Sequence, residues 1–574
     1  MRRILPIAYS ALFLLAAVLY FALLIPQHLH HQEQYQLFLY TSEYAAQVMN
    51  VPGGVADYVG RFLTQFFFFA WPGACIIAAL LTLAQITVWL NMKKKQEVNY
   101  ILSFLPSLIL WIYLCYEMSL LGTVVAFLIA TLAAYGVEKI RNTWARVIIG
   151  VLLIPLLYFF CGPLALLFLL IFLTKEIQRK QKWLTGAIGG IVILALTLPI
   201  FAHYVFPYSL EKLATGVHYF RIQEIPVLPW IAVLLAWVIT LIPRIPAQII
   251  KSESAYSLVS AIVFAILAFW GVWHNTDLYK EEVMKYDYMC RMETWNNIMI
   301  TADKKVPNGP MTVTVLNLAM AKTGYLGNNM FNYYQNGTGG LFQDFQRDYL
   351  QPLPAAEAFY QLGMTSIAQQ YFYEAMEAIP DFQKSGRIYK RLAECSLING
   401  DYQVAKKYLK ALQHTQFYAQ WANETLPLLN DKAVENHPVY GPLRLNRIKE
   451  DFFFSSPEMS SMLGRLFLSN EENRLAFDYL MAWAMLARDL KNIPAYFNLG
   501  SHLYPSRIPA IYQQALLLAW AQTHDGPQGI PWPIQQAVLN DFQQFAAAFA
   551  QKQPQEQMRV RWGHTFWYYN FYKD

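Results

Sequence analysis

Long runs of apolar residues fill most of the chain before residue 274, and they restrict the fold more than any other feature. An α-helix rises about 1.5 Å per residue, so about 20 apolar residues cross the roughly 30 Å hydrocarbon layer of a membrane. Stretches of suitable composition are 4–25, 66–90, 100–116, 120–137, 147–161, 163–174, 183–206, 227–242 and 256–273. We therefore predict a polytopic transmembrane bundle of roughly nine helices over residues 1–273.

The distribution of basic residues predicts the orientation of these spans. Lys and Arg are retained on the cytoplasmic side of short loops. With the N-terminus inside, the inner loops hold most of the basic residues of this half, and the outer loops hold only Arg61, Lys212 and Arg221. The first span follows Arg2 and Arg3 without a small-x-small cleavage site and is interpreted as an uncleaved anchor. These features predict a multi-pass membrane protein with its N-terminus inside and its C-terminal half outside.

The region 147–174 leaves two interpretations open. Two short apolar stretches are separated there by Gly162 and Pro163. We favour a short re-entering hairpin over a single kinked helix. The single helix would reverse the orientation of everything after it.

The second half, residues 274–574, is predicted to be a soluble, all-α repeat domain. Glycine and proline separate helix-length segments, and 311–316 (MTVTVL) is assigned to a helix despite its β-rich composition. Spacings typical of tetratricopeptide units recur at Gly363, Ala368, Phe372, Ala375 and Pro380, at Leu392, Ala393, Gly400, Ala405, Leu409 and Leu412, and at Gly464, Phe467, Ala476, Leu480 and Trp483. Such arrays have a concave surface that can bind a partner. An array of this kind can also serve only to support the membrane half, and the sequence leaves both roles open. The aromatic tail 562–572 either closes the last repeat or lies at the membrane interface.

Most catalytic signatures are absent from the sequence. It contains no Gly-Lys dipeptide for a phosphate loop and no HExxH, GxSxG or GxGxxG spacing. The second half is close to neutral, which argues against a nucleic-acid partner. The remaining candidate is the long first outer loop, 26–65, with a predicted amphipathic surface helix over 35–49. Its ionisable residues are His28, His30, His31, Glu33, Glu43, Asp57 and Arg61, and the three histidines are interpreted as a solvated interfacial turn rather than a metal site.

Two resemblances follow from this arrangement. A first span, a long acidic outer loop, many further spans and an outer domain are together similar to the lipid-dependent membrane glycosyltransferases of GT-C type. The usual Asp-x-Asp or Asp-Glu pair is missing, and the likeness covers the membrane half only. The segment 51–74 (VPGGVADYVGRFLTQFFFFAWPGA), with the repeat-like half and aromatic tail, resembles an uncharacterised family of polytopic proteins from Bacteroidota over most of the chain.

The glycosyltransferase likeness implies roles for particular residues. An acidic residue of the first outer loop acts as general base in that class, which implies Glu33 or Glu43, with Asp57 third. Cations of the outer loops hold the lipid phosphate, which implies Arg61, His218 and Arg221. A divalent metal is one option, and the sequence identifies no cofactor.

Two functions from different classes follow. The first is envelope biogenesis, in which a sugar moves from a polyprenyl-phosphate donor to an extracytoplasmic protein or peptide acceptor held by the repeats. The second is a non-catalytic membrane scaffold whose tetratricopeptide-like repeats bind a partner protein.

Overall fold

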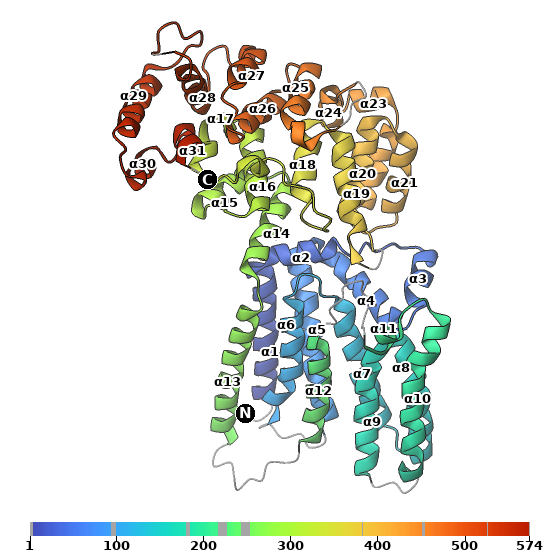
Figure 1. The fold of residues 1–574 in the computed structure, drawn as a ribbon. Helices are drawn as coiled ribbons and strands as arrows, with labels where there is room; N and C mark the ends of the chain where they lie inside the picture. The colour runs from blue at the N-terminus through green and yellow to red at the C-terminus, as the bar shows by residue number, and fades with distance from the viewer. Residues whose placement is uncertain are drawn as a thin grey trace. The chain divides into compact units, whose positions relative to one another are not determined.

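The computed structural model describes residues 4–92, 99–179, 184–215, 227–242, 253–380, 383–449, 454–524 and 526–572. Within these ranges all regular elements are helices, which confirms the all-α prediction (Figure 1). The chain divides into two compact units. The first contains Met1–Glu281 with two short segments, Ile379–Gly386 and His414–Ala419, and the second contains the rest.

Six helical stretches in the described ranges of the first unit are long and apolar enough to cross a membrane. They comprise α1 (Ile4–Leu19) with the π-helical turn Tyr20–Leu24, α5 (Ala70–Asn91), α7 (Leu121–Glu138), α8 (Thr143–Cys161) continuing into α9 (Leu166–Gln178), α10 (Leu184–Val205) and α13 (Glu253–His274). Two shorter apolar helices are α6 (Phe104–Leu114) and α12 (Val227–Leu241). These lengths fit a multi-pass membrane protein, as predicted, whereas the count of nine spans stays a prediction.

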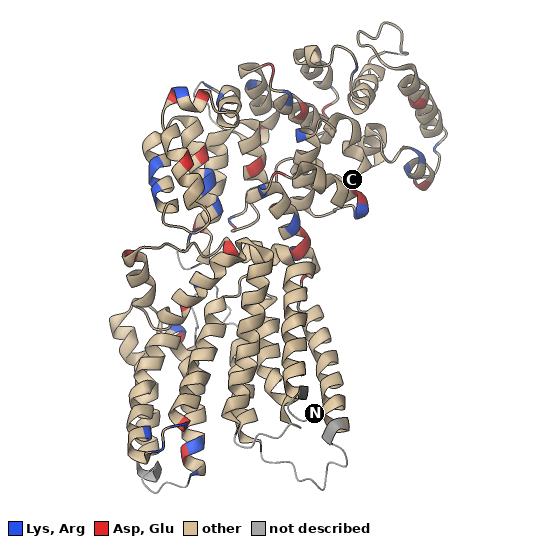
Figure 2. Ribbon diagram, turned by 180° about the vertical axis from the view of Figure 1, so that it is seen from behind, with Lys and Arg blue, Asp and Glu red and all other residues tan. Residues whose placement is uncertain are grey.

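The helices α8 and α9 form an antiparallel hairpin. Gly162 ends α8 with φ of +62° and ψ of −149°, a conformation suited to glycine. Arg146, near the start of α8, donates to Glu176, near the end of α9, over 2.7 Å. Lys175 also bonds Glu138 at the end of α7, and Figure 2 shows charged residues together at this end of the helices. Because the start of α8 and the end of α9 meet, the hairpin interpretation agrees with the structure.

The long first loop is mostly ordered into helices α2 (Pro26–Glu33), α3 (Ser42–Met49) and α4 (Gly54–Thr64). The predicted surface helix over 35–49 is wrong in its first part, because residues 36–40 are not helical. There the Leu37 amide donates to the Lys384 carbonyl (2.9 Å) and the Tyr40 amide to the His414 carbonyl (2.8 Å). Thr41 then caps α3 by accepting from the Tyr44 amide.

The second unit is built from consecutive helices that pack in neighbouring pairs (Figure 1). The prediction for 311–316 is confirmed, since these residues lie in α16 (Pro310–Lys322). The helices are α14 (Leu278–Arg291), which begins in the first unit, α15 (Trp295–Lys304), α16, α17 (Leu326–Asn329), α18 (Leu353–Leu362), α19 (Thr365–Glu377), α20 (Gly386–Asn399), α21 (Tyr402–Leu412), α22 (Ala419–Thr425), α23 (Asp431–Glu435), α24 (Tyr440–Asn446), α25 (Met459–Ser469), α26 (Arg474–Leu486), α27 (Ile493–Leu499), α28 (Ala510–Ala521), α29 (Gln536–Ala550), α30 (Gln555–Trp562) and α31 (Phe566–Tyr572).

Most of the repeat-like positions lie in the core of this unit. Ala368, Phe372 and Ala375 are fully buried on one face of α19, which packs on α18. The aromatic tail is also part of the core, because α31 packs on α28 and Trp567 donates to the Gln514 carbonyl (3.0 Å). This supports the closing-segment interpretation of the tail. Membership of the tetratricopeptide class stays a prediction.

Candidate functional site

Helix α2 is polar in sequence but buried in the first unit. Pro26 stands at its first position, where a missing amide hydrogen costs nothing. His28, His30 and His31 are at most 8% exposed, so the expected solvated turn is wrong. Buried polar groups need hydrogen-bond partners. Several of the partners of α2 come from segments far away in the sequence, such as Glu281 and Tyr418.

At the first turn of α2, His28 and Glu281 form a buried pair. The Nδ1 atom of His28 lies 2.7 Å from Oε1 of Glu281, and the Gln27 amide donates to Oε2 over the same distance. Within the described residues, the buried Nε2 atom of His28 has no hydrogen-bond partner. The Glu281 carboxylate accepts from Nδ1, and this favours the tautomer in which Nε2 is a proton acceptor.

At the last turn of α2, the Glu33 carboxylate is buried among polar side chains. The Tyr418 hydroxyl donates to its two oxygens over 3.1 and 3.3 Å, and the Gln34 amide also donates to it. Ser385 in turn donates to Gln34 over 3.1 Å. The carboxylate is therefore buried and accepts hydrogen bonds from at least Tyr418 and Gln34.

The other predicted site residues have different surroundings. Asp57 and Arg61 form an ion pair of 2.5 Å one turn apart on α4. Burial tends to lower the pKa of Arg61, but Asp57 and Tyr44 raise the pKa above its ordinary value, so the guanidinium stays charged. Glu43 is exposed in the first turn of α3. His218 and Arg221 lie outside the described residues.

Gln383 links Arg61 to the segment just after α2 through two hydrogen bonds. In the amide orientation that suits both neighbours, Gln383 donates to the Tyr35 carbonyl (2.8 Å) and accepts from Arg61 (3.3 Å). Glu33 and Arg61 therefore border the same polar region.

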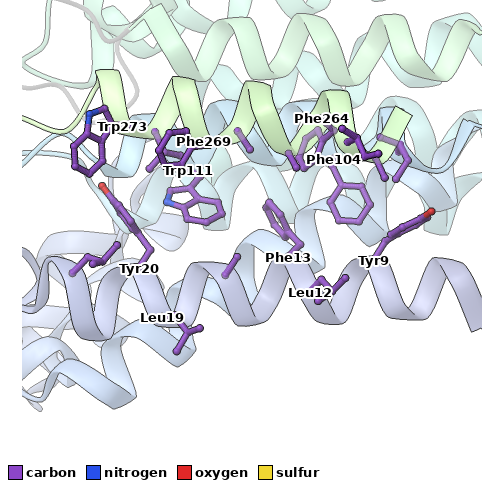
Figure 3. A pocket seen from close by; sticks show the side chains of 18 of the residues that line it. Tyr9, Leu12, Phe13, Leu19, Tyr20, Phe104, Trp111, Phe264, Phe269 and Trp273 are labelled. Carbon is purple, nitrogen blue, oxygen red and sulfur yellow. The ribbon is translucent and has the colours of Figure 1, made fainter. Parts of the chain in front are cut away.

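An apolar cavity of about 830 Å³ lies between α1, α6 and α13 in the membrane part of the first unit (Figure 3). Figure 3 shows Tyr20 and Trp273 at one end of the cavity and Tyr9 at the other. The ring of Phe21 lies 5.0 Å from that of Tyr20 and 6.5 Å from that of His28. One aromatic ring therefore separates the cavity from the His28–Glu281 pair.

A second pocket, of about 590 Å³, belongs to the second unit. Lys322 and Arg474 line it with Glu293 and Tyr360. Lys322 donates to Gln361 (2.8 Å), Gln361 donates to Glu293 (3.1 Å), and burial lowers the pKa of Lys322. The buried Tyr360 hydroxyl has no hydrogen-bond partner within the described residues. Glu293 has a φ of +53°, which is unfavourable for a side chain of this kind.

One protein family matches almost the whole chain. Residues 2–573 match a family of unknown function. The chain belongs to DUF6057. No curated protein and no solved structure matches it. The prediction of an uncharacterised family is thereby confirmed, and DUF6057 includes both the membrane half and the helical half.

Sequence reasoning missed two central residues of this DUF6057 chain. Glu281 stands 253 positions after His28, in a segment that we assigned to the soluble half. Tyr418 is even more distant from Glu33 and shows no local signal. In the described ranges no three His, Cys, Asp or Glu side chains are grouped as metal ligands.

Proposed function

We propose that the chain transfers a sugar from a polyprenyl-phosphate donor to an acceptor outside the cytoplasm, as part of cell-envelope biogenesis. In this proposal the chain lies in a bacterial cytoplasmic membrane with the N-terminus inside and the second unit outside. The observation that carries the proposal is the buried His28–Glu281 pair, one ring away from an apolar cavity between apolar helices.

The proposed reaction is a single displacement. A base takes the proton of an acceptor hydroxyl, whose oxygen forms a bond to the anomeric carbon of the sugar. The bond between that carbon and the phosphate oxygen breaks, and its electron pair leaves with polyprenyl phosphate. Nε2 of His28, oriented by Glu281, is the base favoured by the geometry.

The residues expected from the sequence keep supporting roles in this proposal. Glu33 is buried and is the alternative base, while Asp57 is already paired with Arg61 and Glu43 is exposed. Arg61, with His218 and Arg221, would hold the phosphate that leaves. A divalent metal at the phosphate remains an option of the same proposal.

The pocket of the second unit is the proposed acceptor site. Two cations, Lys322 and Arg474, line it with one carboxylate, that of Glu293, and Tyr360 offers a buried hydroxyl. These groups suit an acidic peptide or protein segment presented by tetratricopeptide-like repeats.

The test is a transfer assay with single variants. The purified chain is reconstituted in vesicles that contain polyprenyl-phosphate hexoses, a peptide mixture is added, and released polyprenyl phosphate is measured by mass spectrometry. We expect His28→Gln to slow release at least 100-fold, the usual contribution of a general base. Glu435→Gln, an exposed substitution in the second unit, should release at the parent rate. Equal rates for parent, His28→Gln and Glu33→Gln would refute enzymatic transfer.

A non-catalytic scaffold is the second candidate, and the same pocket favours it. A partner protein would occupy the pocket lined by Lys322 and Arg474, and the spans would serve as an anchor. This function predicts that Glu33→Gln, Glu43→Gln and Asp57→Asn leave the phenotype of the intact gene unchanged. Deletion of 282–574 would abolish that phenotype.

A further inference from the structure

Two cations in the pocket of the second unit, Lys322 and Arg474, have hydrogen-bond donors to spare. A lysine ammonium has three donors. Within the described residues, that of Lys322 donates to the side-chain oxygen of Gln361 over 2.8 Å and forms no ion pair. Arg474 has the Asp478 carboxylate 3.7 Å away, which is longer than a hydrogen bond, and Asp478 itself accepts from two tyrosine hydroxyls. Both cations can therefore bind an anion.

The guanidinium of Arg474 lies beside the turn that follows α16. Gly324, two residues after Lys322, has a φ of +76°, a conformation that favours glycine. A Cβ atom added to Gly324 would lie 3.7 Å from Nη2 of Arg474. The cation of α26 and the segment that carries the cation of α16 thus border the same part of the pocket.

The carboxylate of Glu293 also lines this pocket, but it is bound to other donors. It accepts from Gln361 over 3.1 Å and from Arg391 over 3.3 Å. Gln361 therefore links this carboxylate to the lysine of the pocket. Arg391 is itself shared with Glu357 and Glu394, so it does not cancel the charge of Glu293.

The net charge of the lining selects the kind of anion. Two cations and one carboxylate leave the described lining with a net charge of +1. A carboxylate with a single negative charge balances this lining, and lysine and arginine both form strong, charge-assisted hydrogen bonds to it. A phosphate monoester carries about 1.5 to 2 negative charges at pH 7 and would leave an excess. The charges therefore favour a carboxylate.

Another part of the lining is apolar. Pro438 and Val439 precede α24, and Pro442 and Leu443 belong to it. Val439 is 51% exposed, so an apolar side chain is open to a ligand there. The volume of about 590 Å³ is within the range of about 300–1,000 Å³ that is common for ligand sites. The pocket therefore has room for an apolar group next to a charged one.

We infer that this pocket binds the carboxylate of a ligand whose neighbouring part is apolar. The carboxyl end of a peptide with an apolar last residue has this chemistry, and so does a short aliphatic acid. The inference deepens the proposed function and rests on it for the role of the pocket as the acceptor site.

Equilibrium dialysis of the full-length chain in nanodiscs measures this binding. The probes are the acetylated tetrapeptide Ala-Ala-Ala-Leu, its C-terminal carboxamide, and 4-methylpentanoate, which has the leucine side chain and a carboxylate without a peptide. We expect the free-acid peptide to bind at least tenfold more tightly than the carboxamide. Weaker binding of 4-methylpentanoate than of the free-acid peptide would assign the ligand to a polypeptide end. Equal binding of the two acids would assign it to a free acid, and either result supports the carboxylate.

Two variants change the charge of the lining at exposed positions. Arg474→Met removes a cation, and Val439→Asp adds a carboxylate. Each should weaken binding of the free-acid peptide at least tenfold and leave the carboxamide unchanged. The matched controls are Arg465→Met on α25 and Val404→Asp on α21, which are exposed and outside the pocket. Both controls should bind like the parent.

Three results would overturn the inference. They are no binding of either acid, equal affinities of the free-acid peptide and its carboxamide, and parent-like binding by both Arg474→Met and Val439→Asp. Carboxylate binding that is sensitive to these variants, without any sugar transfer, would refute the transfer reaction alone. Sugar transfer to peptides at the parent rate in Arg474→Met would refute the inference and leave the reaction standing.

Discussion

At the scale of single residues, the second unit contains a buried network of charges. Glu357 accepts from Arg387 (2.9 Å) and lies 3.0 Å from Arg391. Asp287 and Glu394 complete the pairing of the two arginines. Burial tends to raise the pKa of Glu357, but the two arginines hold the pKa below its ordinary value. The folded state therefore favours the charged carboxylate.

The first prediction concerns Glu357→Gln. Removing one partner of a buried ion pair leaves the arginines uncompensated, so we expect the unfolding free energy to fall by about 3 kcal/mol at pH 7. Because the pKa of Glu357 is lower in the folded state than in the unfolded state, its charge stabilises the fold at pH values above the unfolded pKa. This stabilisation is lost as the pH falls through the folded pKa. Denaturant titrations of parent and variant should therefore converge in acid. A constant difference between them from pH 7 to pH 3 would contradict this account, and exposed Glu435→Gln is the control.

The second prediction concerns Asp478, a buried carboxyl whose pKa is raised, whereas that of Glu357 is lowered. Burial raises the pKa of this carboxyl, which accepts from the hydroxyls of Tyr504 and Tyr512. Because the pKa of this carboxyl is higher in the folded state than in the unfolded state, it stabilises the fold at pH values below the unfolded pKa. That stabilisation is lost as the pH rises through the folded pKa. Asp478→Asn keeps an accepting oxygen without the charge. We expect the melting temperature of the variant at pH 8 to equal or exceed that of the parent, and a large decrease would show that the charge is required.

At the scale of elements, the sequence predicts the apolar helices well and the polar helix α2 poorly. The spans are recognisable because length and hydropathy alone determine them. Helix α2 was assigned to a loop because its residues 27–33 are polar, and polar residues are usually exposed. Its burial depends on Glu281 and Tyr418, which are distant in sequence. The sequence therefore pointed to the loop that contains α2, but it did not reveal the contact between His28 and Glu281.

The third prediction concerns the contact between α4 and α7. A Cβ atom on Gly60 would lie 2.3 Å from the backbone nitrogen of Gly122, so the two backbones touch. Gly60→Ala must push the helices apart, and overpacking of this kind costs about 1–3 kcal/mol. We expect a lower melting temperature in detergent. Gly136→Ala, on α7 with no heavy atom within 4 Å of the added Cβ, should be as stable as the parent or more stable. Equal melting temperatures for the two variants would contradict the close contact.

At the scale of the whole molecule, function depends on which side of the membrane each segment occupies. The proposed transfer needs the first loop and the second unit in the same compartment. Basic residues in the sequence predict this arrangement, and the antiparallel α8–α9 hairpin is compatible with it because α9 returns to the side where α8 begins. The sequence alone did not decide between this hairpin and a single kinked helix, because the ion pair of Arg146 with Glu176 joins residues 30 positions apart.

The fourth prediction tests this arrangement in intact cells. Cysteine is introduced at Lys407, exposed on α21, or at Lys94 in a predicted inner loop, and a membrane-impermeant maleimide is added. We expect Lys407→Cys to be labelled in intact cells and Lys94→Cys to be labelled only after permeabilisation, because Lys94 belongs to a basic run retained in the cytoplasm. The parent, whose cysteines in the second unit are buried, gives the background. Labelling of Lys407→Cys only after permeabilisation would mean an even number of crossings, and His28 would then be on the opposite side from any acceptor held by the second unit.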